Sequence, residues 1–245
     1  MRVTQSSVLY LLPGLLCDGI VWQGQMSALT GAGWDVRVAD FRTFSSIPAM
    51  ALSVLDQAPA HFAVAGHSLG GRVALEIVRQ QPGRVSHLAL LDTGTHAPQP
   101  GEADKRQTLL DLARAEGMAA LAARWLPPMV HPDRLADAPF MAALTAMVER
   151  MSSAIFEGQV KALLTRPDAA PVLPTITCPT LLGVGRQDGW SPPVQHEEMA
   201  RLIPHARLEI FDDSGHMAPM EAPRAVASAM LEWLAIPGRH SKEGG

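Results

Sequence analysis

The chain has 245 residues, of which 47% are hydrophobic and 18% are charged, a balance typical of a globular protein and not of a disordered one. Its formal net charge is −4 and its arginines are scattered, so the composition gives no reason to expect nucleic acid or a membrane surface as a partner. The length suits one α/β domain with room for one inserted subdomain.

The two cysteines, Cys17 and Cys178, are too few for a disulfide framework and lack the spacing of a metal site. We therefore expect reduced thiols, no bound metal and a cytoplasmic protein. The apolar run 8–17 contains Pro13-Gly14 and lacks a clear basic segment and cleavage site, so we expect neither a signal peptide nor a membrane span there.

Short apolar runs alternate with helical patterns in most of the chain. We predict strands at 8–12, 34–39, 62–65, 85–91, 178–184 and 207–211. We predict helices at 18–29, 47–57, 72–81, 194–203 and 222–234. This order predicts an α/β fold, in which helices cover both faces of a mostly parallel, doubly wound sheet.

The segment 94–174 breaks the alternation, because it contains helical patterns at 103–125, 134–151 and 154–164 but no predicted strand. A helical insert between two core strands predicts a short lid, which leaves 1–93 and 175–236 as the core. The polar, glycine-containing end at 237–245 is expected to be flexible. Methionines of the insert either form an adaptable pocket wall or fill a small core beneath it.

Gly66-His67-Ser68-Leu69-Gly70 joins a predicted strand to a predicted helix, which is the context in which G-x-S-x-G forms a nucleophile elbow. Small residues are needed on either side of the serine because the backbones of strand and helix nearly touch there. We predict Ser68 as the nucleophile, with His67 packed into the wall of the site.

A serine nucleophile needs a base, and the base needs an orienting carboxylate. His216 follows the last predicted strand and completes the chain order serine, acid, histidine. Asp188 follows the strand 178–184 at an edge where ligands gather, and we predict it as the acid. Asp92, which follows the strand 85–91, is the alternative position for this carboxylate.

Acyl transfer also needs donors directed at the developing oxyanion, and we predict the backbone N–H groups of Leu69 and Leu15. Gly14 allows the backbone to turn at this point of the loop. Arg124, Arg150 and Arg166 of the insert either meet a substrate carboxylate or form solvated faces. We expect the substrate to contact apolar side chains, namely Leu16, Trp22, Trp125, Met129, Met147, Met151, Trp190 and Met217.

These motifs together resemble the α/β-hydrolase superfamily over almost the whole chain, and the small bacterial carboxylesterase-like group most of all. The resemblance rests on Gly66–Gly70, Gly185-x-x-Asp188, Gly215-His216 and the Leu12-Pro13-Gly14-Leu15 loop. It implies the same roles of nucleophile, acid, base and oxyanion loop for these positions. The chain departs from many members in carrying Pro13-Gly14 where they carry His-Gly.

We therefore expect a serine hydrolase that cleaves a carboxylic ester or thioester of a small to medium apolar substrate through an acyl-enzyme on Ser68. Its partners would be the small-molecule substrate and water, with no cofactor. Carbon–carbon bond hydrolysis, cofactor-free perhydrolysis, acyl transfer and a ligand receptor with vestigial activity use the same residues and remain alternatives. No oligomeric state follows from these patterns.

Overall fold

A computed structural model describes residues 7–238, and most of the predicted flexible tail, 239–245, lies outside the described residues. Six strands form one parallel sheet in the order β2-β1-β3-β4-β5-β6. The strands are β1 (Val8–Leu12), β2 (Asp35–Val38), β3 (Phe62–His67), β4 (Val85–Leu91), β5 (Thr180–Gly185) and β6 (Arg207–Phe211). The predicted parallel α/β fold is confirmed.

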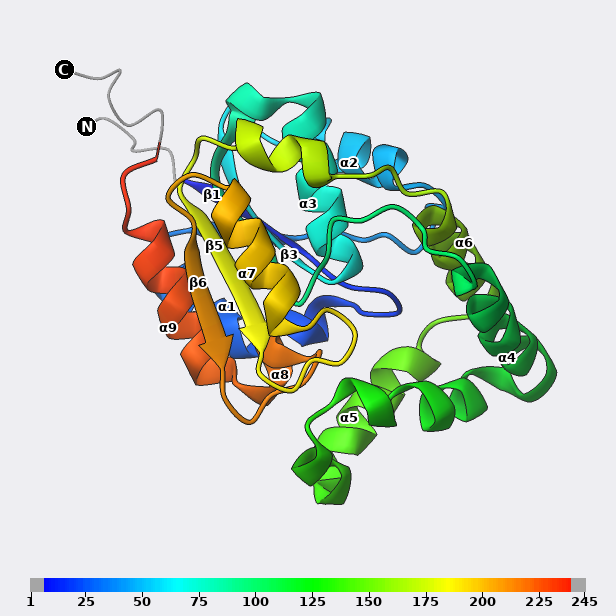
Figure 1. Ribbon diagram of the computed structural model, residues 1–245. Helices are drawn as coiled ribbons and strands as arrows, with labels where there is room; N and C mark the ends of the chain where they lie inside the picture. The colour runs from blue at the N-terminus through cyan, green and yellow to red at the C-terminus, as the bar shows by residue number, and fades with distance from the viewer. Residues whose placement is uncertain (1–6, 239–245) are drawn as a thin grey trace.

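The four inner strands are almost completely buried because helices cover both faces of the sheet. Every residue of β1, β3 and β5 is buried, whereas the edge strands β2 and β6 are partly exposed. Helices α1 (Gln23–Gly31) and α9 (Pro223–Leu234) pack on one face. Helices α2 (Ile47–Leu55), α3 (Leu69–Gln80) and α7 (Pro193–Leu202) lie on the other (Figure 1).

The insert between β4 and β5 contains no strand between residues 92 and 179. Its α-helices are α4 (Glu102–Trp125), α5 (Ala138–Glu149) and α6 (Ser153–Leu164), and Figure 1 shows them extending to one side of the sheet. Within residues 7–238, no helix combines the length and the hydropathy needed to cross a bilayer.

Two predicted helices are divided by local capping. In the segment 18–29, the Asp18 side chain accepts a hydrogen bond from Ile20 N and begins a 3-10 turn, Gly19–Trp22, ahead of α1. In the segment 134–151, the Asp137 side chain accepts from Phe140 N and starts α5 anew after a 3-10 turn. Short polar side chains that bond to nearby backbone groups compete with a continuous helix.

The junction of β3 and α3 brings three backbone segments into contact. A Cβ atom on Gly66 would overlap the carbonyl oxygen of Gly70, and one on Gly70 would overlap that of Leu12. Between them Ser68 adopts φ 52° and ψ −114°, which a non-glycine residue rarely occupies. Its N–H donates to the Leu91 carbonyl at 2.9 Å, which anchors the turn to β4.

Gly66→Ala is expected to lower the free energy of unfolding by at least about 2 kcal/mol, because the added methyl group must push strand and helix apart. Urea denaturation followed by circular dichroism measures this. Gly31→Ala is the matched control, since nothing lies within 4 Å of a Cβ atom there. Equal stabilities of the two variants would contradict the close packing described at the elbow.

Candidate active site

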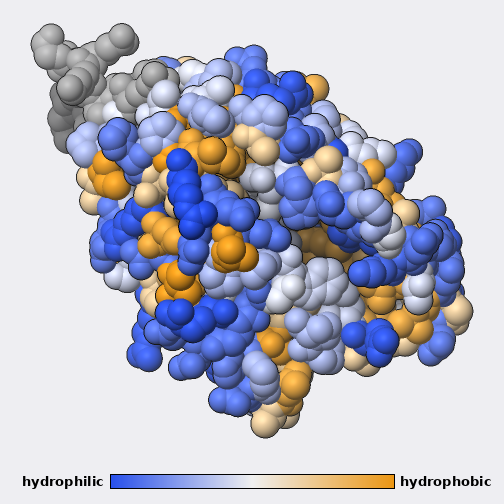
Figure 2. Space-filling model, in the orientation of Figure 1, coloured by the Kyte–Doolittle hydropathy of each residue, from blue (hydrophilic) through white to orange (hydrophobic). Residues whose placement is uncertain are grey.

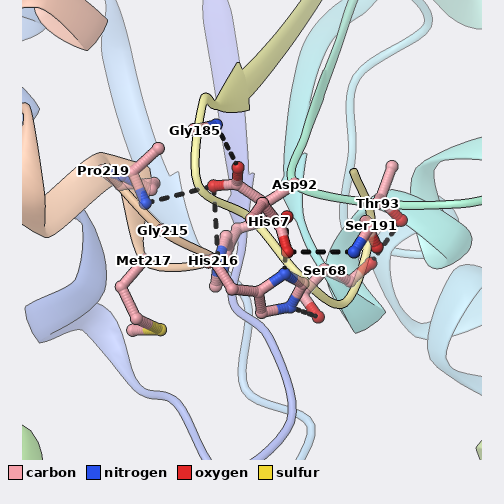
Figure 3. Close-up of polar contacts among 12 residues, drawn as sticks. His67, Ser68, Asp92, Thr93, Gly185, Ser191, Gly215, His216, Met217 and Pro219 are labelled. Carbon is pink, nitrogen blue, oxygen red and sulfur yellow. Dashed lines mark hydrogen bonds and ion pairs between the residues drawn. The ribbon is translucent and has the colours of Figure 1, made fainter. Parts of the chain in front are cut away.

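Ser68, His216 and Asp188 form a continuous chain of hydrogen bonds at the carboxyl edge of the sheet. His216 Nε2 lies 2.9 Å from Ser68 Oγ, and His216 Nδ1 lies 2.8 Å from Asp188 Oδ2. Figure 3 shows Ser68 and His216 directed at each other. A hydroxyl bonded to an imidazole that a carboxylate orients is the arrangement that activates a serine for nucleophilic attack.

Asp188 is held by the loop that follows β5. Its Oδ1 accepts from the N–H groups of Trp190 at 2.7 Å and Ser191 at 2.9 Å, which leaves Oδ2 for His216. Burial alone would raise the pKa of Asp188, but His216 and these two N–H groups outweigh it and hold the pKa below the usual value. The carboxylate therefore remains charged beside the imidazole.

Asp92, the alternative acid, lies behind this chain of bonds and does not bond to the His216 ring. Its Oδ1 accepts from Gly185 N at 2.9 Å and its Oδ2 from Ala218 N at 3.1 Å, as Figure 3 shows in part. The side chain is completely buried, and burial together with the charge of Asp188 raises its pKa well above the usual value. Asp92 thus ties the end of β4 to the last residue of β5 and to the turn after His216.

The loop that carries His216 is held by Glu221, which the sequence analysis did not identify. Glu221 Oε2 accepts from Gly215 N at 2.8 Å and from Met217 N at 3.2 Å. Its Oε1 accepts from His131 N of the insert at 2.6 Å. Burial raises the pKa of Glu221, although these three N–H groups act against the rise. The only signal in the sequence is a carboxylate five positions after the histidine.

His67 packs behind the base and stays neutral. Its Nε2 donates to the His216 carbonyl at 2.8 Å, and its ring packs edge-on against Trp22. Burial, reinforced by the neighbouring His216, lowers the pKa of His67 to about 3. Trp22 is fully buried and is not among the residues that line the cavity beside Ser68.

The loop after β1 reaches the cavity beside Ser68. Leu16 N donates to Gln159 Oε1 of α6 at 2.9 Å and is therefore occupied. Leu15 lines the cavity together with Ser68 and Leu69. Leu69 is the first residue of α3, where backbone N–H groups have no intrahelical acceptor. Gln159 is buried in the insert, and no motif in the sequence pointed to it.

A cavity of about 270 Å³ opens at Ser68 and His216, between the core and the insert. Figure 2 shows the surface hollowed here, with hydrophobic residues in the hollow. Of the residues expected to contact substrate, Trp125, Met129 and Trp190 line the cavity. The others are buried outside its lining, namely Leu16, Trp22, Met147, Met151 and Met217.

Of the three arginines noted in the insert, only Arg166 lines this cavity, where it binds Glu102 through two nitrogens. Arg150 instead forms an ion pair with Asp18 near the surface, at 2.8 Å. Arg124 is exposed at a neighbouring depression of the surface. Within residues 7–238, no group of three or more His, Cys, Asp or Glu side chains is arranged to hold a metal ion.

The neutral state of His67 predicts a pH dependence of stability. Its folded pKa of about 3 lies below the ordinary 6.5, so the unfolded chain binds a proton in this interval that the native state does not. The free energy of unfolding therefore falls as the pH falls through 6.5. His67→Gln keeps a donor but cannot titrate, so its urea denaturation should show a shallower loss from about pH 7 to about pH 4.5. An equal loss of unfolding free energy with falling pH in the wild type and in His67→Gln would contradict the prediction.

The model of the alpha/beta hydrolase family matches residues 9–229. The chain is 32% identical, over 76% of its length, to the 2-hydroxy-6-oxononadienedioate/2-hydroxy-6-oxononatrienedioate hydrolase of Escherichia coli K12. It is 30% identical, over 70% of its length, to the Cupriavidus pinatubonensis hydrolase of the same name. These matches span 66% and 61% of the relatives' own lengths, less than two thirds of each.

Solved structures agree with this result. A thermophilic esterase from Thermogutta terrifontis, solved with malate bound, superposes with a TM-score of 0.85 at 28% identity, covering 94% of this chain and 90% of that one. The enol-lactonase of Burkholderia xenovorans LB400 also gives 0.85 and shares the fold, at 24% identity and with coverage of 96% and 93%. The family match extends over nearly all of the described residues, and the chain belongs to the alpha/beta hydrolase family.

Proposed function

We propose that the protein is a serine hydrolase that cleaves carboxylic esters through an acyl-enzyme on Ser68. The observation that carries the proposal is the chain of hydrogen bonds from Ser68 Oγ to His216, at 2.9 Å, and from His216 to Asp188, at 2.8 Å. Ser68 and His216 also line a cavity that can admit a substrate. Hydroxyl, imidazole and carboxylate are in bonding order, so the serine can lose its proton as it attacks.

In this mechanism Ser68 Oγ forms a bond to the ester carbonyl carbon while His216 Nε2 accepts the hydroxyl proton. The oxyanion receives hydrogen bonds from the N–H groups of Leu15 and Leu69. Collapse of the intermediate breaks the bond to the alcohol, which leaves with the proton from His216. Water then attacks the acyl-enzyme with the same base, and Ser68 regains its proton. Asp188 keeps the required imidazole tautomer and stabilises the imidazolium.

Carbon–carbon bond hydrolysis is the second candidate, because the two relatives described above are hydrolases of 2-hydroxy-6-oxo dioates. The esterase from Thermogutta terrifontis supports the ester proposal instead. Comparison of kcat/KM for 2-hydroxy-6-oxononadienedioate and for a series of 4-nitrophenyl esters separates the two. A higher value for the dioate than for every ester would favour carbon–carbon cleavage.

Ser68→Ala is expected to reduce kcat for 4-nitrophenyl esters by a factor on the order of 10⁴ to 10⁶, because no other group supplies the nucleophile. Release of 4-nitrophenolate by the purified variant measures the loss, and circular dichroism checks the fold. Ser228→Ala, at an exposed position of α9, is the control and should keep wild-type activity. More than a tenth of wild-type activity in Ser68→Ala would overturn the proposed mechanism.

Asp188→Asn is expected to reduce kcat roughly 10⁴-fold, because the amide favours the wrong tautomer of His216 and gives no charge to the imidazolium. Asp92→Asn should cost much less in kcat, since Asp92 does not bond to the His216 ring and acts on stability through Gly185 and Ala218. The same ester assay on both purified variants measures the difference. If Asp92→Asn proved the more damaging to kcat, Asp92 would have to be the acid.

A further inference from the structure

One side of the cavity beside Ser68 carries an excess of positive charge. Four cationic side chains line it, and Glu102 is the one carboxylate among the residues that line it; the cations are Arg72, Lys105, Arg106 and Arg166. His96, which also lines this side, adds no charge at neutral pH because burial and the nearby Arg72 lower its pKa. Glu102 is engaged by Arg166 through two bonds of 2.8 and 2.7 Å and by Arg106 at 2.7 Å.

Arg72 has no carboxylate partner among residues 7–238. Its Nη1 donates to the backbone carbonyl of His96 at 2.9 Å, and that is a neutral acceptor. Glu76, one turn further along α3, binds Arg79 and Gln80 instead. Burial, together with repulsion from Arg166, lowers the pKa of Arg72 to about 9. Glu102 attracts Arg72 without bonding to it, and its oxygens are already engaged by Arg166 and Arg106. A bound anion would offset the cost of keeping these buried cations together.

The position of Arg72 relates this charge to the proposed nucleophile. Ser68 is the residue before α3, and Arg72 lies in the first turn of that helix, where its N–H donates to the Ser68 carbonyl at 3.3 Å. Both residues line the cavity. The guanidinium lies beside the loop after β4, with Nη1 on the His96 carbonyl and Nη2 3.3 Å from where a Cβ atom of Gly94 would lie. Because both residues line the same cavity, one ligand can contact Ser68 and Arg72 together.

The wall between the two positions is apolar, which fits a short hydrocarbon chain. Leu109, Trp125, Met129 and Leu163 line the cavity together with the charged residues. Trp190 lies on the His216 side, with its ring centroid 6.2 Å from the imidazole. Because His216 must protonate the leaving alcohol, the alcohol belongs on the Trp190 side. The acyl part then extends along α3 towards Arg72.

We propose that Arg72 and the cations around it form a carboxylate-binding subsite, and that the substrate is an ester whose acyl chain ends in a carboxylate. The planar guanidinium offers paired donors that match a carboxylate. The identity of the substrate as an ester rests on the proposed hydrolase function. Binding of a carboxylate by Arg72 and its neighbours does not depend on that function.

The direct test compares two esters that differ only in charge, mono-4-nitrophenyl glutarate and its neutral terminal amide. The wild-type protein should prefer the carboxylate by about tenfold or more in kcat/KM, as expected for one charge-assisted hydrogen bond. Arg72→Gln should bring the ratio close to one, and Arg72→Lys should leave an intermediate ratio. Arg224→Gln, which removes a charge from an exposed position of α9, should keep the wild-type ratio.

A second measurement does not depend on turnover. Calorimetric titration of the Ser68→Ala protein with glutarate should show binding, and the added Arg72→Gln change should abolish it. Ser68-dependent hydrolysis of both esters at equal rates, with no glutarate binding, would overturn the subsite and leave the hydrolase intact. Glutarate binding through Arg72 without hydrolysis of either ester would support the subsite and overturn the ester reaction. Neither binding nor hydrolysis would overturn both.

Discussion

Where β3 turns into α3, three backbone segments meet with no side chain between them. Gly66 approaches Gly70, and Gly70 approaches Leu12, so strand, helix and the end of β1 are in direct contact. This contact forces Ser68 into its positive φ and places the start of the loop after β1 beside the serine. The same geometry explains Gly14, since a Cβ atom there would press on His67 and Ser68. The other reactive groups of the site are arranged around a turn that the backbone itself fixes.

Three buried carboxylates then perform three different tasks because their surroundings differ. Asp188 meets an imidazole and two N–H groups and keeps its charge. Asp92 lies deeper, beside the charge of Asp188, and burial favours its protonated form. Glu221 receives three N–H groups from two loops and joins the loop of His216 to the insert. Residue type alone does not separate these roles, whereas the number and direction of the donors around each carboxylate do.

The sequence was sufficient for the fold because alternation of short apolar runs and helices is a local pattern. The motif around Ser68 is equally local. In a parallel sheet, the loops that follow the strands lie at the same edge as Ser68, which limits the candidates for the acid and the base. The choice between Asp188 and Asp92 was harder, since both follow strands at the same edge and only their partners distinguish them. Gln159 and Glu221 could not be predicted because their partners are distant in sequence or set by the fold. The place of Arg72 in the cavity lining likewise depends on how the insert packs over the core. For Met147 and Met151 the sequence left a pocket wall and a small core equally open, and both side chains are buried outside the lining of the cavity.

Two hydrogen bonds between the insert and the core differ in how much they depend on the side chain that the insert provides. The Met129 carbonyl accepts from His216 N at 2.7 Å, and any residue can supply that oxygen. Gln159 accepts from Leu16 N with its side chain, and most replacements would leave that buried N–H unpaired. The contact at Met129 is therefore independent of side-chain type, whereas the contact from α6 depends on the amide of Gln159. A chimaera that grafts a foreign insert onto this core would need to preserve that single amide to keep the loop after β1 in place.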